Sequence, residues 1–291
     1  MVESRFGYLL IIPALLTIAV VAIYPIIDVF ILSLYERFLT LGIDEFTGLN
    51  NYLKLVNDAR FWNALKNTAV FTFFSVSLEL ILGMAVALFI NRPFSLQGLI
   101  RAAVLLPWAV PTVVSAKIWA WIFNTDLGIL NYALLNFGLI DADLNWLGST
   151  GYAMAAAITV DVWKTTPFAA LLLLAGLQVI PDDLYKAASV DGASRWQKFR
   201  HITIPHLKPV IMIVLLFRTL DAFRVFDAIY ILTGGGPANS TETLSVYAYK
   251  ILFQTLDFGY GSTIAVSVFA AVMLISIGYI SILKRRGGLL S

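Results

Sequence analysis

The sequence predicts an all-α integral membrane protein with six transmembrane helices. Of its 291 residues, 59% are apolar and only 13% are charged, and the mean hydropathy is +0.84. Soluble domains carry about twice that share of charge, so this chain lacks the polar surface that a water-soluble particle needs. Six segments reach the roughly 20 apolar residues that a helix needs to cross a bilayer. They are residues 8–35, 68–90, 102–123, 152–180, 209–232 and 262–283.

The first span is predicted to be a retained helix rather than a cleavable signal peptide. Its apolar run is far longer than the core of a signal peptide, and no small-x-small cleavage site follows before Glu36. Several spans contain proline, and neighbouring helices can satisfy the carbonyls that proline leaves free. We therefore expect kinks rather than breaks at these positions, which are Pro13, Pro25, Pro107, Pro111 and Pro167.

The distribution of Lys and Arg predicts the orientation in the membrane. The N-terminus, the segment 91–101, the loop 181–208 and the C-terminal tail hold eleven basic residues, against five in the segments on the other side. Cytoplasmic loops are enriched in Lys and Arg, so both termini are expected in the cytoplasm. The outer segments contain short amphipathic pieces near residues 49–53 and 128–139. No segment is long enough for a soluble domain, so residues 1–291 are expected to form one membrane domain.

Composition also excludes several kinds of site. The net charge of +2 gives no reason to expect a nucleic-acid partner, and the absence of cysteine excludes thiolate metal ligands. The only histidines, His201 and His206, have no further ligands nearby in the sequence, so no metal site is predicted. No phosphate-binding Gly-x-x-x-x-Gly-Lys motif and no nucleophile–base pair is found, so no catalytic residue is predicted and the chain is not expected to be an enzyme by itself.

The polar loop between the fourth and fifth spans, residues 181–208, has a pattern of its own. Pro181 followed by two acidic residues favours a helix start, and a short helix over 182–190 is predicted to end at Gly192. A second amphipathic piece follows at residues 196–203. Two readings remain open from the pattern alone: an amphipathic loop resting on lipid headgroups, or a docking element for another protein.

This loop resembles the signature loop of binding-protein-dependent ABC importer permeases. The matching residues are Ala187-Ala188-x-x-Asp191-Gly192-Ala193, followed by Phe199, Ile202, Pro205 and Pro209. The resemblance implies a type I importer permease core with short periplasmic helices and a cytoplasmic coupling helix that docks on an ATPase subunit. It implies ATPase-coupling roles for Leu184, Ala187, Ala188, Asp191, Gly192, Ala193, Phe199 and Pro205. Where the family has Glu, this chain has Lys186, so no acidic contact with the ATPase is carried over at this position.

Further motifs look like the sugar-importer branch of this family, in particular the first permease of a maltose-type pair. They are Phe46-x-Gly48-Leu49-x-Asn51-Tyr52, Gly128-Ile129-Leu130-Asn131 and Gly235-Gly236-Pro237. Residues 162–168 and 216–224 are closer still to trehalose-importer permeases. The resemblance implies an α-linked disaccharide substrate such as trehalose or maltose, and a location in the bacterial inner (plasma) membrane.

The same resemblance implies a set of partners. It implies a second permease subunit, two copies of a cytoplasmic ABC ATPase, and an extracytoplasmic sugar-binding protein or lipoprotein. ATP and Mg²⁺ are then expected in the partner ATPase, with no cofactor bound by this chain.

Ionisable residues inside the spans each need a partner or a function, because burying one in a bilayer costs about 2.5–3.5 kcal/mol. The fifth span carries Arg218, Asp221, Arg224 and Asp227 at three-residue spacing, which on one continuous helix places Arg218 and Asp227 on opposite faces. We therefore expect some of these charges to brace helices and others to line the transport path. Carboxylates, guanidinium groups and aromatic rings suit a polyhydroxyl ligand. From this chemistry and the resemblance, the predicted substrate-binding residues are Asp161, Thr165, Phe168, Asp221 and Arg224.

A secondary transporter driven by an ion gradient is the alternative function, with acidic residues in the spans as proton or sodium sites. It leaves the loop 181–208 unexplained, and no inverted repeat is visible in the sequence. Dependence of uptake on ATP rather than on an ion gradient separates the two.

Overall fold

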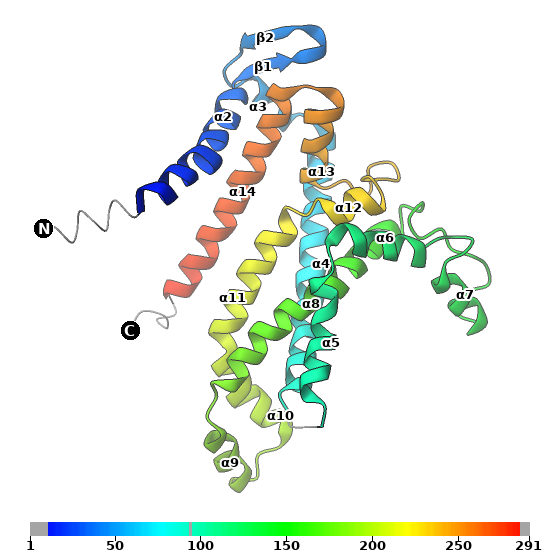
Figure 1. Cartoon of the computed structure of the whole chain (residues 1–291), viewed down its shortest axis with the longest axis vertical. Helices are drawn as coiled ribbons and strands as arrows, with labels where there is room; N and C mark the ends of the chain where they lie inside the picture. The colour runs from blue at the N-terminus through cyan, green and yellow to red at the C-terminus, as the bar shows by residue number, and fades with distance from the viewer. Residues whose placement is uncertain (1–10, 93–94, 286–291) are drawn as a thin grey trace, which may run out of the picture. The chain divides into compact units, whose positions relative to one another are not determined.

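The chain folds into two compact groups of helices, seen in a computed structural model that describes residues 11–92 and 95–285 (Figure 1). The first unit comprises Met1–Trp62 and Tyr247–Ala271, and the second comprises Asn63–Val246 and Val272–Ser291. The expectations for residues 8–10, and for the basic residues Arg5 and Arg286, fall outside the described residues. The single domain over 1–291 stays a prediction.

Among the described residues, five helices are long and apolar enough to cross a membrane, and a bent helix pair supplies the sixth candidate span. The predicted six-span, all-α membrane fold is therefore confirmed, with revised boundaries. The five helices are Ile11–Leu32, Ala59–Ile90, Ala153–Gln178, Arg195–Phe223 and Phe258–Ile282, and the bent pair is Gln97–Ala109 with Thr112–Ile122.

In the first unit, a helix, a hairpin and a short helix follow one another. The helix Ile11–Leu32 contains a π turn, η1 (Ala19–Ile23), and continues as α2 (Tyr24–Leu32). The strands β1 (Tyr35–Phe38) and β2 (Ile43–Phe46) pair antiparallel around the 3-10 turn η2 (Leu39–Leu41). This hairpin was not predicted, because two four-residue strands give little period-two signal.

The short helix predicted near residues 49–53 is present as α3 (Asn50–Val56), and its location on the outer side stays a prediction. The amide of its Asn51 donates hydrogen bonds to the carbonyl oxygens of Ser33 (3.1 Å) and Tyr35 (2.8 Å), which ties α3 to the start of the hairpin. The unit also contains the π turn η4 (Lys250–Thr255). Three helices, α4 (Ala59–Ile90), α13 (Leu244–Tyr249) and α14 (Phe258–Arg285), have residues in both units.

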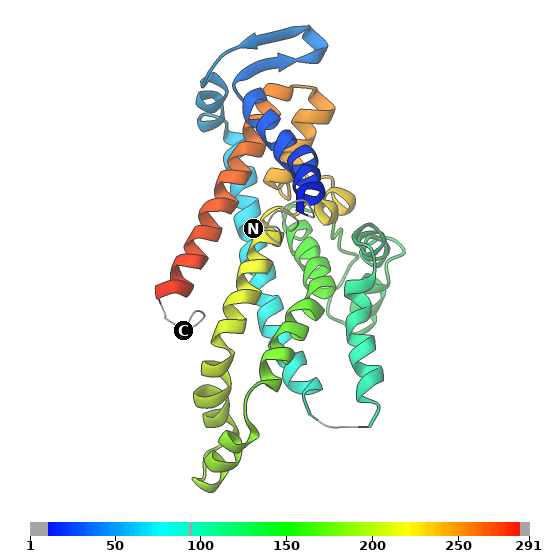
Figure 2. The same cartoon turned by 60° about the vertical axis from the view of Figure 1, so that its left-hand side comes forward.

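The second unit is built on α4, α8 (Ala153–Gln178) and α11 (Ile204–Phe223). Small residues let these helices approach closely: a Cβ at Gly83 of α4 would lie 2.9 Å from the Cβ of Ala169 on α8. A Cβ at Gly176 of α8 would likewise lie within 3 Å of Leu207 on α11. Figures 1 and 2 show α8 and α11 side by side along their length. Such small-residue contacts are typical of helices packed in membranes.

Four prolines are accommodated within the helices of the spans, in two ways. Pro107 and Pro167 lie inside α5 (Gln97–Ala109) and α8 without ending them, as predicted. Pro25 follows the π turn η1, and Pro205 follows a second π turn, η3 (Phe199–Thr203). The wider turn gives room for a ring that would otherwise clash with the carbonyl four residues earlier.

Pro111 breaks the third span, so the expected kink there was wrong. α5 ends at Ala109 and α6 begins at Thr112 (Thr112–Ile122), with a bend of 92° between them. Val110, which precedes the proline, has extended geometry (φ −74°, ψ 132°). Proline disfavours helical geometry in the residue before it, which accounts for the turn.

The fifth span also differs from the predicted 209–232. The helix begins at Arg195, runs through Pro205 and Pro209, and ends at Phe223; a separate short helix, α12 (Asp227–Leu232), follows. No proline or glycine lies between α11 and α12. The Val225 carbonyl in this break accepts a hydrogen bond from the Thr243 hydroxyl (3.1 Å), so a contact from a distant segment satisfies it.

The loop between α8 and α11 folds as predicted. α9 (Asp182–Val190) covers the expected residues, and Gly192 has a φ of +75°, the left-handed geometry that glycine adopts readily. α10 (Arg195–Lys198) then begins with Ser194 and Gln197 in a capping box. The other predicted outer piece is α7 (Ile129–Asn136). In the second unit, α9 and α10 lie near one end of α8 and α11, while α6 and α12 lie near the other (Figure 1).

Candidate functional site

A cavity of about 600 Å³ lies in the second unit, where both broken spans turn. Its lining comes from α5, α6, α8, α11, α12 and the segment between α11 and α12, with Val272 of α14. This volume is within the range of small-molecule sites. The two helix breaks therefore place backbone and side chains of four spans around one space.

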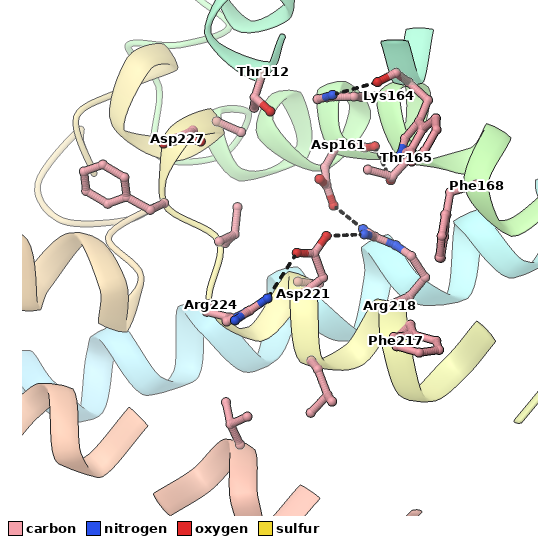
Figure 3. A pocket seen from close by; sticks show the side chains of 17 residues that line it. Thr112, Asp161, Lys164, Thr165, Phe168, Phe217, Arg218, Asp221, Arg224 and Asp227 are labelled. Atoms are coloured by element: carbon pink, nitrogen blue, oxygen red, sulfur yellow. Dashed lines mark hydrogen bonds and ion pairs between the residues drawn. The ribbon is translucent and has the colours of Figure 1, made fainter. Parts of the chain in front are cut away.

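All five residues predicted to bind substrate line this cavity (Figure 3). Asp161, Thr165 and Phe168 come from α8, Asp221 comes from the last turn of α11, and Arg224 follows it. The Asp161 side chain is 12% exposed, whereas those of Asp221 and Arg224 are 60% and 64% exposed. The structure thus brings the predicted residues together, and their role in binding stays a prediction.

Arg218 of α11 is the centre of the charges at the cavity wall. Its buried guanidinium donates from Nε and Nη2 to the two carboxylate oxygens of Glu79, with an Nη2–Oε1 distance of 2.9 Å. Nη1 donates to Oδ2 of Asp221 (2.6 Å), and Nη2 lies 3.4 Å from Oδ2 of Asp161. One cation therefore holds carboxylates from α4, α8 and α11, as the dashed lines in Figure 3 show for the two that line the cavity.

Glu79 of α4 lies behind the cavity wall and is fully buried. Its Oε1 is also 2.6 Å from the hydroxyl of Thr165, which lies at the same distance from the Asp161 carbonyl oxygen. Since a buried charge is stable only when paired and hydrogen-bonded, the bidentate contact with Arg218 explains how Glu79 stays in the membrane interior. This pair confirms the expectation that some intramembrane charges brace helices.

Arg218 was recognised in the sequence as a charge within a span, and Glu79 lies in the predicted span 68–90, but neither was among the predicted site residues. A sequence signal for Glu79 does exist. Thr68, Thr72, Ser75 and Glu79 recur at three- and four-residue spacing on α4, and all four are buried. Such a stripe marks one polar face of an apolar helix that points into the protein.

The expectation that Arg218 and Asp227 face opposite ways was wrong. Both residues line the cavity together with Asp221 and Arg224. The expectation assumed one continuous helix, but α11 ends at Phe223 and the chain turns before α12 begins at Asp227. The break resets the helical phase, so four charges at three-residue spacing reach one space.

Lys164 of α8 stabilises the other break. Its Nζ donates to the carbonyl oxygen of Val110 (2.9 Å) and lies 3.5 Å from that of Trp108. These carbonyls lose helical partners where α5 stops ahead of Pro111. Lys164 lines the cavity, but its ammonium group is occupied with the backbone of the broken third span.

Aromatic rings form the apolar part of the cavity. The rings of Trp108 and Phe168 lie 6.0 Å apart at 31°, and Phe217, which also lines the cavity, is 54% exposed. Rings of this kind pack against the apolar faces of sugar rings, while carboxylates accept hydrogen bonds from hydroxyl groups. The arrangement suits a polar, hydroxyl-rich ligand with an apolar face.

The eight residues predicted to couple to an ATPase lie on and after α9. Leu184, Ala187, Asp191, Gly192 and Pro205 are exposed, and Ala188, Ala193 and Phe199 are half-buried. Their coupling role stays a prediction.

Two contacts organise this region. The Tyr185 hydroxyl lies 2.9 Å from that of Thr203, which ties α9 to the helix that continues as α11. Lys186, at the position where the family has Glu, pairs with Asp183 at 2.9 Å on the surface of α9.

Within residues 11–92 and 95–285, no group of three or more His, Asp or Glu side chains is arranged to hold a metal ion. His201 and His206 each contact a backbone carbonyl four residues earlier through Nδ1.

Known proteins resemble this chain over most of its length. The family model described as "Binding-protein-dependent transport system inner membrane component" matches residues 79–286. The trehalose/maltose transport system permease protein MalF of Thermococcus litoralis is 44% identical over 98% of this chain and 95% of its own length. The trehalose transport system permease protein SugA of Mycobacterium tuberculosis is 40% identical over 97% of this chain and 90% of its own.

A solved structure shares the fold. A chain of a bacterial ABC transporter involved in the import of the acidic polysaccharide alginate superimposes with a TM-score of 0.86, at 22% identity, over 98% of this chain and 97% of that one.

Proposed function

This chain belongs to the family of binding-protein-dependent transport system inner membrane components, and we propose that it forms half of the translocation path of an ATP-driven sugar importer. Family membership and the long apolar helices make it a multi-pass permease of the inner membrane. It is a transport subunit rather than a catalytic one. The observation that carries the proposal is the cavity between the broken third and fifth spans.

In this proposal, the residues of the cavity have separate roles. Asp161 and Asp221 accept hydrogen bonds from sugar hydroxyls, and Arg224 donates to sugar oxygens. Phe168 packs against the apolar face of the sugar, and Thr165, which lines the cavity with it, is a further contact with the sugar. The exposed oxygens of Asp221 and the exposed Arg224 support these roles.

The proposed substrate is an α-linked disaccharide such as trehalose or maltose. Two relatives, at 44% and 40% identity over nearly the whole chain, carry these sugars in their names. The cavity volume of about 600 Å³ is consistent with a ligand of that size.

The proposed complex contains a second permease subunit, two copies of a cytoplasmic ABC ATPase and an extracytoplasmic sugar-binding protein or lipoprotein. ATP and Mg²⁺ bind in the ATPase, and this chain binds no cofactor. The family description, which names dependence on a binding protein, supports this composition, as does the absence of a phosphate-binding Gly-Lys motif from the sequence.

In the complex, α9 is the element that docks on the ATPase. It is short, exposed and held by Pro181 at its start, Gly192 at its end and the Tyr185–Thr203 contact. A stiff element of this kind transmits a rigid-body movement to α8 and α11, which carry the cavity residues. This assignment puts the loop 181–208 and both termini in the cytoplasm.

Uptake by the reconstituted complex in proteoliposomes tests the function. Uptake of labelled trehalose or maltose should require ATP on the side of the ATPase and should survive an ionophore. Uptake that does not depend on ATP and is abolished by the ionophore alone would favour an ion-driven transporter instead.

Two substitutions test the cavity. Asp161→Ala and Asp221→Ala should lower substrate-stimulated uptake without lowering the yield of the assembled complex. Wild-type transport by both variants, in complexes of normal yield, would remove the sugar-contact role from these residues.

A further inference from the structure

The three cations at the cavity all have partners in the protein. Arg218 is held by Glu79, Asp161 and Asp221, and the Lys164 ammonium group donates to backbone carbonyls. Arg224 lies more loosely, with Nη2 3.9 Å from Oδ1 of Asp221. Few positively charged donors therefore remain for a ligand.

Acceptor oxygens, by contrast, are available. Asp161, Asp221 and Asp227 line the cavity, and the Asp221 and Asp227 side chains are exposed in it. With Glu79 behind the wall, four carboxyl groups stand against three cations, so the site has no excess of positive charge. Such a site accepts hydrogen bonds from hydroxyl groups and offers no counter-charge to an anion.

We propose that Glu79 makes this site selective for uncharged sugars over anionic ones, by occupying the guanidinium of Arg218. The inference rests on the proposed function, because it assumes that a sugar binds in this cavity. Glu79 does not line the cavity and reaches it through its contacts with Arg218 and Thr165, so it is a positioning residue. Its two carboxylate oxygens engage Nε and Nη2, which turns the cation towards α4.

A substitution that removes only the charge isolates this effect. The amide of Glu79→Gln keeps the size of the side chain and one acceptor for Arg218, but leaves part of the positive charge of Arg218 without compensation. An anionic group in the cavity should then bind more tightly by about tenfold, since a unit charge several ångströms away acts at an effective dielectric near 20. Removing the cation as well, in Glu79→Gln/Arg218→Gln, should abolish that gain.

Direct binding to the purified transporter complex is the readout, so that the selectivity of the binding protein does not enter. Trp108 lines the cavity beside Phe168, and quenching of its fluorescence reports occupancy. The same titration of a Trp108→Phe complex gives the background. The probes are trehalose, trehalose 6-phosphate and 6-amino-6-deoxytrehalose, which share one scaffold and differ in charge.

In the wild-type complex, trehalose 6-phosphate should bind at least about tenfold more weakly than trehalose, and the amino sugar at least as well as trehalose. Glu79→Gln should reduce the difference in affinity between trehalose and trehalose 6-phosphate, and Glu79→Gln/Arg218→Gln should restore that difference. Asp227→Asn removes an exposed carboxylate and no buried pair, and it should reduce the same difference in affinity by a smaller factor. It tests the selectivity against anionic sugars independently of how well Glu79→Gln folds. Asp28→Asn is the matched control, because it removes an exposed acidic residue of the first span outside the cavity lining.

Two failures have different meanings. Equal binding of trehalose and its phosphate by the wild type, or an unchanged difference in affinity in both Glu79→Gln and Asp227→Asn, would overturn the selectivity while leaving the sugar site in place. No sugar-dependent, Trp108-dependent signal with any probe would overturn the sugar site itself, and the selectivity with it.

Discussion

Two carboxylates, one in each unit, are held in place by different chemistry. In the second unit, Glu79 is fully buried and paired with the guanidinium of Arg218. In the first unit, Oδ2 of the half-buried Asp58 accepts hydrogen bonds from the hydroxyl groups of Tyr247 (2.6 Å) and Tyr260 (2.5 Å), and Oδ1 accepts one from the Arg60 backbone N–H (2.8 Å).

Cations are also present near Asp58, but they lie over the phenol rings. The Lys54 ammonium group is 4.3 Å from the centre of the Tyr260 ring, and the Arg60 guanidinium is 4.7 Å from that of Tyr247. The difference follows from burial: a fully buried carboxylate needs a full opposite charge, whereas a half-buried one can be held by neutral donors and by water. Only the ion-paired carboxylate stands beside the cavity.

Arg218→Met should have the largest effect on stability. It leaves Glu79 buried without a counter-charge, which should lower the free energy of unfolding by about 3–5 kcal/mol. Unfolding of the purified protein in lipid bicelles measures this free energy. Arg224→Met is the matched control, because that side chain is 64% exposed and pairs only loosely, so it should cost less than about 1 kcal/mol. Equal costs for the two variants would contradict the distinction between a buried and an exposed pair.

Asp58→Asn should cost less, about 1–2 kcal/mol, because it weakens hydrogen bonds to a partly exposed group and leaves no buried charge unpaired. The same unfolding measurement applies. A loss of stability as large as that of Arg218→Met would mean that Asp58 and its hydrogen bonds from Tyr247 and Tyr260 stabilise the protein as much as the Glu79–Arg218 ion pair does.

Tyr247→Phe should cost about 0.5–1.5 kcal/mol, since Asp58 keeps its bonds from Tyr260 and the Arg60 backbone. In an Asp58→Asn background the same substitution should cost less, because its partner is already changed. Additive costs would show that the Tyr247 hydroxyl stabilises the protein independently of Asp58.

The smallest expected effect is on pH dependence. Burial of the Asp58 carboxyl opposes its ionisation, but hydrogen bonds from Tyr247 and Tyr260 outweigh that cost and hold its pKa below the ordinary value of 3.8. The carboxylate therefore contributes its full stability above about pH 4 and loses it as the pH falls through the lowered folded-state pKa. The difference in stability between wild type and Asp58→Asn should be flat above about pH 4 and shrink below it; a difference that grows with acidity would contradict the lowered pKa.

The sequence predicts elements well where local chemistry decides them. α9 was predicted over its actual residues because Pro181, two acidic residues and Gly192 mark its ends within a dozen positions. The third span shows an intermediate case: Pro111 was visible in the sequence, but whether a proline kinks or breaks a helix depends on what satisfies the freed carbonyls. Here Lys164, more than fifty residues away, satisfies Val110 and allows the 92° turn.

The break in the fifth span has no local signal, and the site depends on it. Without proline or glycine between Phe223 and Asp227, the sequence favours a continuous helix. The expectation that Arg218 and Asp227 lie on opposite faces followed from that continuous helix. The five predicted binding residues were nevertheless brought together, because they lie on α8 and at the end of α11, next to the two breaks. Glu79 was missed as a site residue because its relation to the cavity is set by tertiary contacts, the bidentate bond from Arg218 and the contact with the Thr165 hydroxyl.

The most direct test of a sugar path through this cavity is a cryo-electron microscopy map of the assembled transporter, prepared with trehalose and trapped with an ATP analogue. Density for the sugar is expected between α8 and α11, with hydroxyl groups at Asp161 and Asp221 and a ring face against Phe168. Sugar density elsewhere along the path, with this cavity closed or filled by side chains in every trapped state, would contradict it.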